Sequence, residues 1–135
     1  MENMTIKLPV SVKAKVTESL KKQLIAEVQD AIKNVDMELE QIEFHARRVL
    51  TEQAKIDAQG LAAVRQQIEG EKQQRLAIKN DMTNKLQEAE ALELGAEIVR
   101  GTLERMVTVA VGDNIRQVMG AEILVEDDKV IAFRD

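Results

Sequence analysis

The sequence contains no cysteine, and this absence excludes several kinds of chemistry at once. A chain without cysteine forms no disulfide, offers no thiolate to a metal and has no cysteine nucleophile. It also fits a reducing compartment, so we expect a cytoplasmic protein. His45 is the one histidine, so no cluster of imidazole ligands exists. We therefore interpret His45 as a surface residue of a helix rather than a metal ligand or general base.

Aromatic residues are almost missing as well. The chain has two Phe, no Trp and no Tyr, so aliphatic residues and Met must build its core. Single-stranded nucleic acids bind on aromatic platforms and phosphates attract basic clusters, so a net charge of -5 with so few aromatics does not favour nucleic-acid binding. A charged fraction of 32% beside 44% hydrophobic residues is typical of long solvated helices rather than of a disordered chain.

Long apolar runs and catalytic motifs are also lacking. No stretch of about 18 apolar residues occurs, and the alternating segment 1–16 is no signal peptide, so we expect no membrane segment. Two glycine-rich motifs bind phosphate groups, G-x-x-x-x-G-K-[ST] and G-x-G-x-x-G, and neither is present. Neither Ser11 nor Ser19 lies in a nucleophile elbow of the G-x-S-x-G type. The acidic segment 126–128 lacks the spacing of a calcium loop and reads as a turn. We therefore expect no cofactor, no metal site and no enzymatic activity.

The first pattern along the chain is that of a β-strand. From Met4 to Val16 every even position is apolar, which is the period of a strand with one buried face. Pro9 interrupts this pattern and marks an edge, a bulge or a break, because proline donates no backbone hydrogen bond.

At Thr17 the hydrophobic period changes from 2 to 3.5, and Thr17 is a suitable N-cap. Spacings of 3 and 4 then alternate as in a coiled coil. One helix over 17–57 would be about 60 Å long and would have to project from a small domain. The seam comprises Ile25, Val28, Ile32, Val35, Leu39, Ile42, Ala46, Val49, Gln53 and Ile56.

A second, looser seam follows a predicted turn near 57–62 that contains Gly60. Gly95 stands where a left-handed residue would end this second helix. Leu76 and Leu86 offer an alternative register one residue further on. The seam that we predict comprises Leu61, Val64, Ile68, Glu71, Arg75, Ile78, Met82, Lys85, Ala89 and Leu92.

From Gly101 the period returns to 2, which predicts three further strands in the last part of the chain. The first runs from Gly101 to about Val111, a short helix over 114–119 follows, and the other strands cover 123–126 and 129–133. Asp127 and Asp128 suit a tight turn between the last two.

The two β regions need each other, since neither buries a core alone. If they pair, Val16 and Leu94 lie close together and the helices must go out and return. We therefore predict an α+β fold: a long antiparallel helical hairpin (coiled coil) at 17–94 on a small antiparallel β domain built from N- and C-terminal strands at 4–16 and 95–135. The competing arrangement has two helices end to end with strands pairing between chains.

Short segments of the chain resemble the bacterial YlqD family. They lie at 41–48, 92–98, 109–114 and 123–131. The resemblance implies a protein of unknown function with no catalytic residues to assign. By association with ribosome maturation, it also implies a ribosomal or RNA-linked role as an alternative. One departure is Glu93, where the family has a proline that stops the helix.

Apolar residues outside the helical seams are the candidate contact surface. Met37 and Phe44 are seven residues apart at an outer heptad position, and Leu50 and Leu76 extend this outer row. Exposed apolar rows indicate another protein surface, so we expect self-association of hairpins or binding of a partner helix. The alternative is that the register drifts and buries these residues within the hairpin.

Two readings of function follow from the sequence. The first is a non-catalytic structural or adaptor protein that acts through protein–protein contacts of the hairpin, with a partner protein or a second copy. The second is a ribosome-associated or RNA-binding factor with a local basic patch. The residues available for that patch are Lys13, Lys15, Lys21, Lys22, Arg47 and Arg48.

Overall fold

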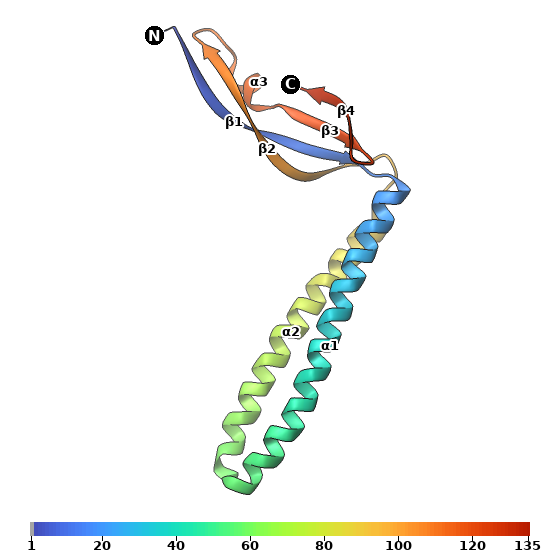
Figure 1. Ribbon diagram of the computed structural model, residues 1–135, viewed down its shortest axis with the longest axis vertical. Helices are drawn as coiled ribbons and strands as arrows, with labels where there is room; N and C mark the ends of the chain where they lie inside the picture. Colours follow the sequence, from blue (N-terminus) through green and yellow to red (C-terminus); the bar gives the residue numbers. More distant parts are fainter. Residues whose placement is uncertain (1) are drawn as a thin grey trace. The chain divides into compact units, whose positions relative to one another are not determined.

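The computed structural model describes residues 2–135. These residues form two compact units, which we describe separately. The β unit comprises the chain up to Lys22 together with Leu92–Asp135, and the hairpin unit comprises Gln23–Ala91. The elements are β1 (Asn3–Lys15), α1 (Glu18–Ile56), the short 3-10 helix η1 (Ala58–Gly60), α2 (Leu61–Ala91), β2 (Glu97–Ala110), α3 (Ile115–Met119), β3 (Glu122–Glu126) and β4 (Lys129–Arg134) (Figure 1).

A four-stranded sheet in the order β2-β1-β3-β4 forms the β unit. β1 pairs with β2 in antiparallel fashion from Asn3 opposite Ala110 to Lys15 opposite Glu97. The N- and C-terminal strands therefore build one sheet, and the predicted α+β class is confirmed. The predicted strand at 4–16 is β1, and Pro9 lies in the part of β1 that precedes the β3 pairing, which starts at Ser11.

One strand pair differs from the all-antiparallel sheet that we predicted. β1 and β3 run parallel, with Ser11 opposite Glu122, while β3 and β4 are antiparallel. The reason is the connection after β2. Because β2 ends beside the start of β1, the chain passes through α3 and enters β3 further along β1 in the same direction. This connection carries β3 to the side of β1 that β2 leaves free.

β2 is longer than the sequence pattern indicated. It begins at Glu97, whereas the regular alternation begins at Gly101. The register of β1 and β2 shifts at Val12 and Lys13, which pair with Gly101 and Val99 and leave Arg100 as the extra residue of a bulge. A bulge breaks the period of two, so the alternation could not reveal the first part of this strand.

The two ends of the helical segment meet at Val16. Its carbonyl oxygen accepts from the amide of Gly95 at 2.8 Å, and its own amide donates to the carbonyl of Ala96 at 2.7 Å. The expected closeness of Val16 and Leu94 therefore holds, and the helices go out and return. α2 ends at Ala91, three residues before the predicted boundary, and Gly95 has the left-handed φ of 88° that we expected of it.

Local hydrogen bonds also fix the start of α1. The hydroxyl of Thr17 accepts from the amide of Leu20 at 3.1 Å, as a helix N-cap does. The same hydroxyl donates to the carboxylate of Asp127 at 2.7 Å, in the turn between β3 and β4. Asp127 and Asp128 both have positive φ, at 48° and 66°, which is the backbone of a tight hairpin turn.

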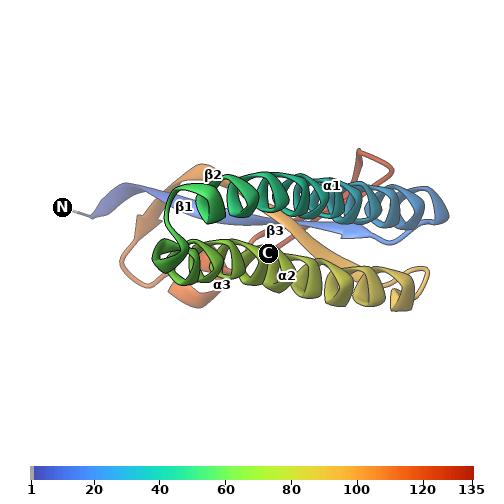
Figure 2. The same cartoon turned by 90° about the horizontal axis from the view of Figure 1, so that it is seen from below.

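The hairpin unit contains α1 from Gln23 onward together with η1 and α2, and the two long helices lie side by side (Figure 2). η1 makes the turn between them, and the carboxylate of Asp57 accepts from the amide of Gln59 at 2.9 Å. The α1 seam is inward over most of its length, with Val35 and Ala46 buried. Ile56 is wrong as a seam residue, because it is 81% exposed where the chain enters the turn.

The α2 seam follows the predicted one in part. The seven predicted seam residues that are buried or half-buried are Leu61, Val64, Ile68, Arg75, Met82, Ala89 and Leu92. Lys72, Lys79 and Leu86 are half-buried at the positions that we assigned to Glu71, Ile78 and Lys85, which are exposed. These three positions all lie beyond Gly70. Leu86 thus follows the alternative register, whereas Leu76 is 39% exposed. Long lysine side chains cover apolar surface with their stems while the ammonium groups reach polar partners, which explains how they replace apolar residues here.

Candidate functional site

Three ion pairs join the two helices at the middle of the hairpin. Lys79 Nζ lies 2.6 Å from Asp36 Oδ1, and Arg75 Nε lies 2.6 Å from Glu38 Oε2. Lys72 pairs with Glu43 in the same way. All the cations come from α2 and all the carboxylates from α1. This arrangement fixes how α1 and α2 face each other.

Two of these pairs lie on one side of the hairpin, which we call the Phe44 flank. It carries Asp36 and Glu43 from α1, seven residues apart, and Lys72 and Lys79 from α2, also seven apart. Phe44 follows Glu43 directly on this side. Arg75 pairs toward the other side, because Glu38 stands on the opposite side of the α1 seam from Asp36 and Glu43.

Leu76 belongs to the same flank. It stands four residues after Lys72 and three before Lys79, and residues at these spacings share one helix face. By the same rule Ile78, three residues after Arg75, belongs to the other side of α2. Leu76 and Ile78 are similarly exposed, at 39% and 42%.

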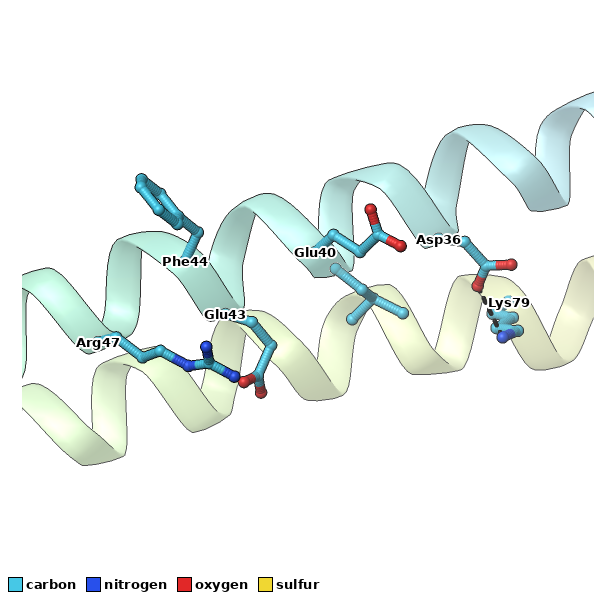
Figure 3. Close-up of a pocket in the computed structure, with 7 residues that line it drawn as sticks. Asp36, Glu40, Glu43, Phe44, Arg47 and Lys79 are labelled. Atoms are coloured by element: carbon cyan, nitrogen blue, oxygen red, sulfur yellow. Dashed lines mark ion pairs between the residues drawn. The ribbon is translucent and has the colours of Figure 1, made fainter.

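A groove of about 640 Å³ runs along the Phe44 flank (Figure 3). The side chains of Glu43 and Arg47 point toward each other beside it, whereas the ring of Phe44 points away from α2 (Figure 3). Hydrogen bonding to Lys72, with a smaller contribution from its charge, lowers the pKa of Glu43. The groove is lined by Asp36, Leu39, Glu40, Glu43, Phe44, Arg47 and Lys79.

Phe44 also borders a second depression toward the tip of the hairpin, formed with Arg47, Arg48 and Lys55 among others. The phenyl ring is 74% exposed. An aromatic ring left in water between two hollows is unusual on a helix whose neighbours are charged, since burial of such a ring is favourable. The geometry therefore provides an apolar anchor with space on either side of it.

The predicted contact residues lie as follows. Met37 is 51% exposed on the outer side of α1, so neither Met37 nor Phe44 is buried within the hairpin. Leu50 is half-buried, and Leu76 is at the surface of α2. The structure brings Phe44 and Leu76 to the same flank. Met37 lies two turns before Phe44 on the same stripe of α1.

The residues of the predicted basic patch are divided between the two units. Lys13 pairs with Glu122 at 2.8 Å, and Lys21 Nζ donates to the carbonyl of Leu92 at 2.9 Å. Lys15 and Lys22 also belong to the β unit, whereas Arg47 and Arg48 belong to the hairpin unit. Arg48 lies 3.6 Å from Glu52 one turn later in α1. Several of these side chains are thus already engaged with acceptors of the same unit.

Sequence reasoning missed the cross-helix ion pairs. Lys72, Arg75 and Lys79 repeat at spacings of 3 and 4, and α1 offers acidic residues at positions flanking its seam. That complementary pattern was the available signal.

Within residues 2–135, no group of three or more His, Asp or Glu side chains is placed to hold a metal ion. Over the same residues, neither long helix has an apolar stretch sufficient to cross a bilayer.

A protein of known structure has a similar fold. A search of curated proteins gives no match. The chain is similar to a protein of unknown function from Synechococcus sp. WH 8102, known from a crystal structure. The two share 26% identity and a TM-score of 0.77, over 98% of this chain and 95% of that one. The profile of the YlqD protein family matches residues 4–134. The chain therefore belongs to the YlqD family.

Proposed function

We propose that this protein is a non-catalytic, cytoplasmic structural or adaptor protein whose hairpin binds a helix of a partner protein through the Phe44 flank. The observation that carries the proposal is the position of Phe44. Its ring is 74% exposed between two grooves, on a hairpin whose helices are joined by three ion pairs. Exposed aromatic residues beside hollows are common anchors of protein interfaces.

Pre-organisation supports this role of the flank. The pairs Lys79–Asp36 and Lys72–Glu43 hold α1 against α2 along the groove, which Asp36, Glu43 and Lys79 help to line. A partner would therefore meet a surface that is already formed and would lose little conformational entropy of this chain on binding. Phe44 has few rotamers, so its immobilisation also costs little.

The chemistry of the flank indicates the kind of partner. Phe44 and Leu76 supply apolar area, while Glu40 and Arg47 supply one charge of each sign at the groove. An amphipathic helix matches this pattern when it has a large apolar residue for the groove and mixed charges at its margins. Nucleic acid matches it poorly, because a phosphate backbone would meet Glu40 and the other carboxylates of the groove.

The lowered pKa values of two glutamates give no separate indication of catalysis. The pKa of Glu43 and that of Glu97 are lowered, and in each the first cause is a hydrogen bond from a basic side chain, Lys72 or Arg134. Structural ion pairs produce such shifts as readily as active sites do. The sequence adds no cysteine and no nucleophile motif.

A capture experiment tests the proposal. The tagged full chain is expressed in its source cell, and captured proteins are compared between wild type and Phe44→Glu. We expect at least one captured protein to be lost in this variant, because burial of a carboxylate in place of the ring is costly. Ile78→Glu is the matched control, since it makes the same change on the other side of α2, and it should retain that protein.

If Phe44→Glu and wild type capture the same proteins in the same amounts, the Phe44 flank is not the binding surface. Circular dichroism of the Phe44→Glu variant, with helix content equal to that of wild type, excludes unfolding as the cause of a loss. Nuclease treatment before capture separates a direct protein contact from one mediated by RNA.

A further inference from the structure

The outer edge of β2 is the longest unpaired strand edge in the part of the chain that the structure describes. β2 has 14 residues and pairs only with β1, because it is the first strand in the order β2-β1-β3-β4. It contains no proline and no lysine, two of the residues that protect such edges, and its single bulge at Arg100 leaves the ten residues from Gly101 to Ala110 as regular strand. β4, at the other edge, has six residues, begins with Lys129 and pairs through an irregular register.

We propose that two copies of this chain associate through β2, antiparallel and about a two-fold axis at Thr102, to form one continuous sheet. This inference goes beyond the hairpin contact and does not depend on it. In an antiparallel pair with that centre, Thr102 lies opposite Thr102 of the second copy. Directly opposed threonines are a favourable cross-strand pair.

Charge complementarity selects this register. With Thr102 at the axis, Arg100 of one copy lies opposite Glu104 of the other, and the symmetry repeats the pair on the other side. Like charges directly opposite are unfavourable in a sheet. Centres at Arg100, Glu104 or Arg105 would each place a charge against its own copy. Arg100 makes no ion pair within residues 2–135, whereas Glu104 lies 3.3 Å from Lys7 and can accept from both cations.

Shape supports the same register. Leu103 of one copy would lie opposite Gly101 of the other. Leu103 is 57% exposed on the face of the sheet that carries Val10, its partner in β1. A Cβ at Gly101 would meet no atom within 4 Å, so that side of Gly101 is open space. The leucine side chain of the second copy would fill this space and be removed from water, which favours association.

The faces are consistent with one continuous sheet. Thr102 lies opposite Ser11 and Glu104 opposite Pro9, so these residues share one face, while Gly101 and Leu103 share the other with Val12 and Val10. The residues from Gly101 to Ala110 lie on one side of the β2 bulge, and Arg100 is the extra residue of that bulge. The central pairs of the dimer, Thr102 with Thr102 and Gly101 with Leu103, therefore lie in regular strand, and the Arg100–Glu104 pair is made at the bulge.

The absence of native cysteine makes the axis directly testable. Thr102→Cys would place two thiols opposite each other across the axis. Opposed Cα atoms in an antiparallel pair are about 4.5–5.5 Å apart, which is within the range of a disulfide. Under mild oxidation we expect this variant of the full chain to migrate as a disulfide-linked dimer. Thr108→Cys, on the same strand and face, is the matched control, because Thr108 would not meet its own copy, and it should form no disulfide-linked dimer.

The mass of the wild-type chain in solution provides a second test of the dimer. We expect wild type to reach twice the chain mass of 15.1 kDa at high concentration. Gly101→Val should raise the dimer dissociation constant at least about tenfold by filling the space for Leu103, while the open surroundings let the monomer fold. Arg100→Glu should weaken the dimer in the same way, and Arg116→Glu on α3 should not.

Each contrary result overturns the proposal. A wild-type chain that stays monomeric at its highest soluble concentration would do so. Equal cross-linking of the Thr102→Cys and Thr108→Cys variants would also do so, because it would show no symmetric register. A dimer that survives Gly101→Val and Arg100→Glu but is lost in Phe44→Glu would place self-association on the hairpin instead. That last result leaves capture of a partner by the Phe44 flank as a separate question.

Discussion

The amide of Gly95 donates a hydrogen bond to the carbonyl oxygen of Val16 at 2.8 Å. Val16 is 2% exposed and immediately follows β1, and Gly95 is the last residue but one before β2. This bond therefore joins the segment that leaves the sheet for α1 to the segment that returns from α2. The long helical insertion begins and ends at neighbouring points of one strand pair.

Substitution of Gly95 tests this joint. Gly95 has a φ of 88°, and a Cβ there would meet no atom within 4 Å, so only the backbone conformation resists a side chain. We expect Gly95→Ala to lower the free energy of unfolding by about 1 kcal/mol, measured by urea denaturation.

Gly70→Ala is the control for this prediction. Gly70 lies within α2, and a Cβ there also meets no atom within 4 Å. Alanine favours the helix over glycine by about 1 kcal/mol, so this variant should be more stable than wild type. If both substitutions change stability in the same direction, the left-handed conformation of Gly95 is not what holds the joint.

The pH dependence of stability tests the ion pair between Glu43 and Lys72. Lys72 lowers the pKa of Glu43 below its ordinary value of 4.5. A carboxylate with a lowered pKa in the folded state stabilises that state above the unfolded pKa, and the contribution is lost as pH falls through the folded pKa. We expect Glu43→Gln to be less stable than wild type at pH 7, and the difference to vanish as pH falls well below 4.5.

Glu40→Gln provides the comparison for that titration. Glu40 lines the same groove, and no ion pair within residues 2–135 involves it. The variant should follow the wild-type curve of unfolding free energy against pH. A Glu43→Gln curve that also coincides with wild type would show that the pair contributes no stability to the hairpin.

The sequence predicted the architecture because each part of it leaves a periodic signal. The alternation from Met4 to Val16 gave β1, and the α1 seam gave the long helix. The closing of the hairpin followed from the need of the two β regions for each other. What failed were features that interrupt a period. The bulge at Arg100 concealed the start of β2, and beyond Gly70 three predicted positions of the α2 seam each moved to the following residue.

The candidate site was predicted only in part, for a related reason. Met37 and Phe44 were recognised as outward-facing because the α1 register is regular. Lys72 and Lys79 were not recognised as inward-facing, because strictly alternating spacings of 3 and 4 after Ile68 place Glu71 and Ile78 at the seam instead. Their aliphatic stems and their partners on α1 become visible only once the two helices are placed side by side.

Salt dependence separates the adaptor role from an RNA-binding role. Binding through Lys and Arg contacts to phosphates weakens steeply with ionic strength. We expect the purified chain to show no co-sedimentation with ribosomes or total RNA even at low salt, since Lys13 and Lys21 are engaged within the β unit. Co-sedimentation that is strong at low salt and disappears as salt rises would instead support the RNA-binding reading.

Site-specific photo-cross-linking in the source cell tests the role of the Phe44 flank most directly. A photoreactive phenylalanine analogue replaces Phe44 in one strain and Ile78, on the other side of α2, in a second. We expect irradiation to give a discrete cross-linked product with a second protein from position 44, and none from position 78. Absence of any product from position 44, or the same products from both positions, would contradict the account.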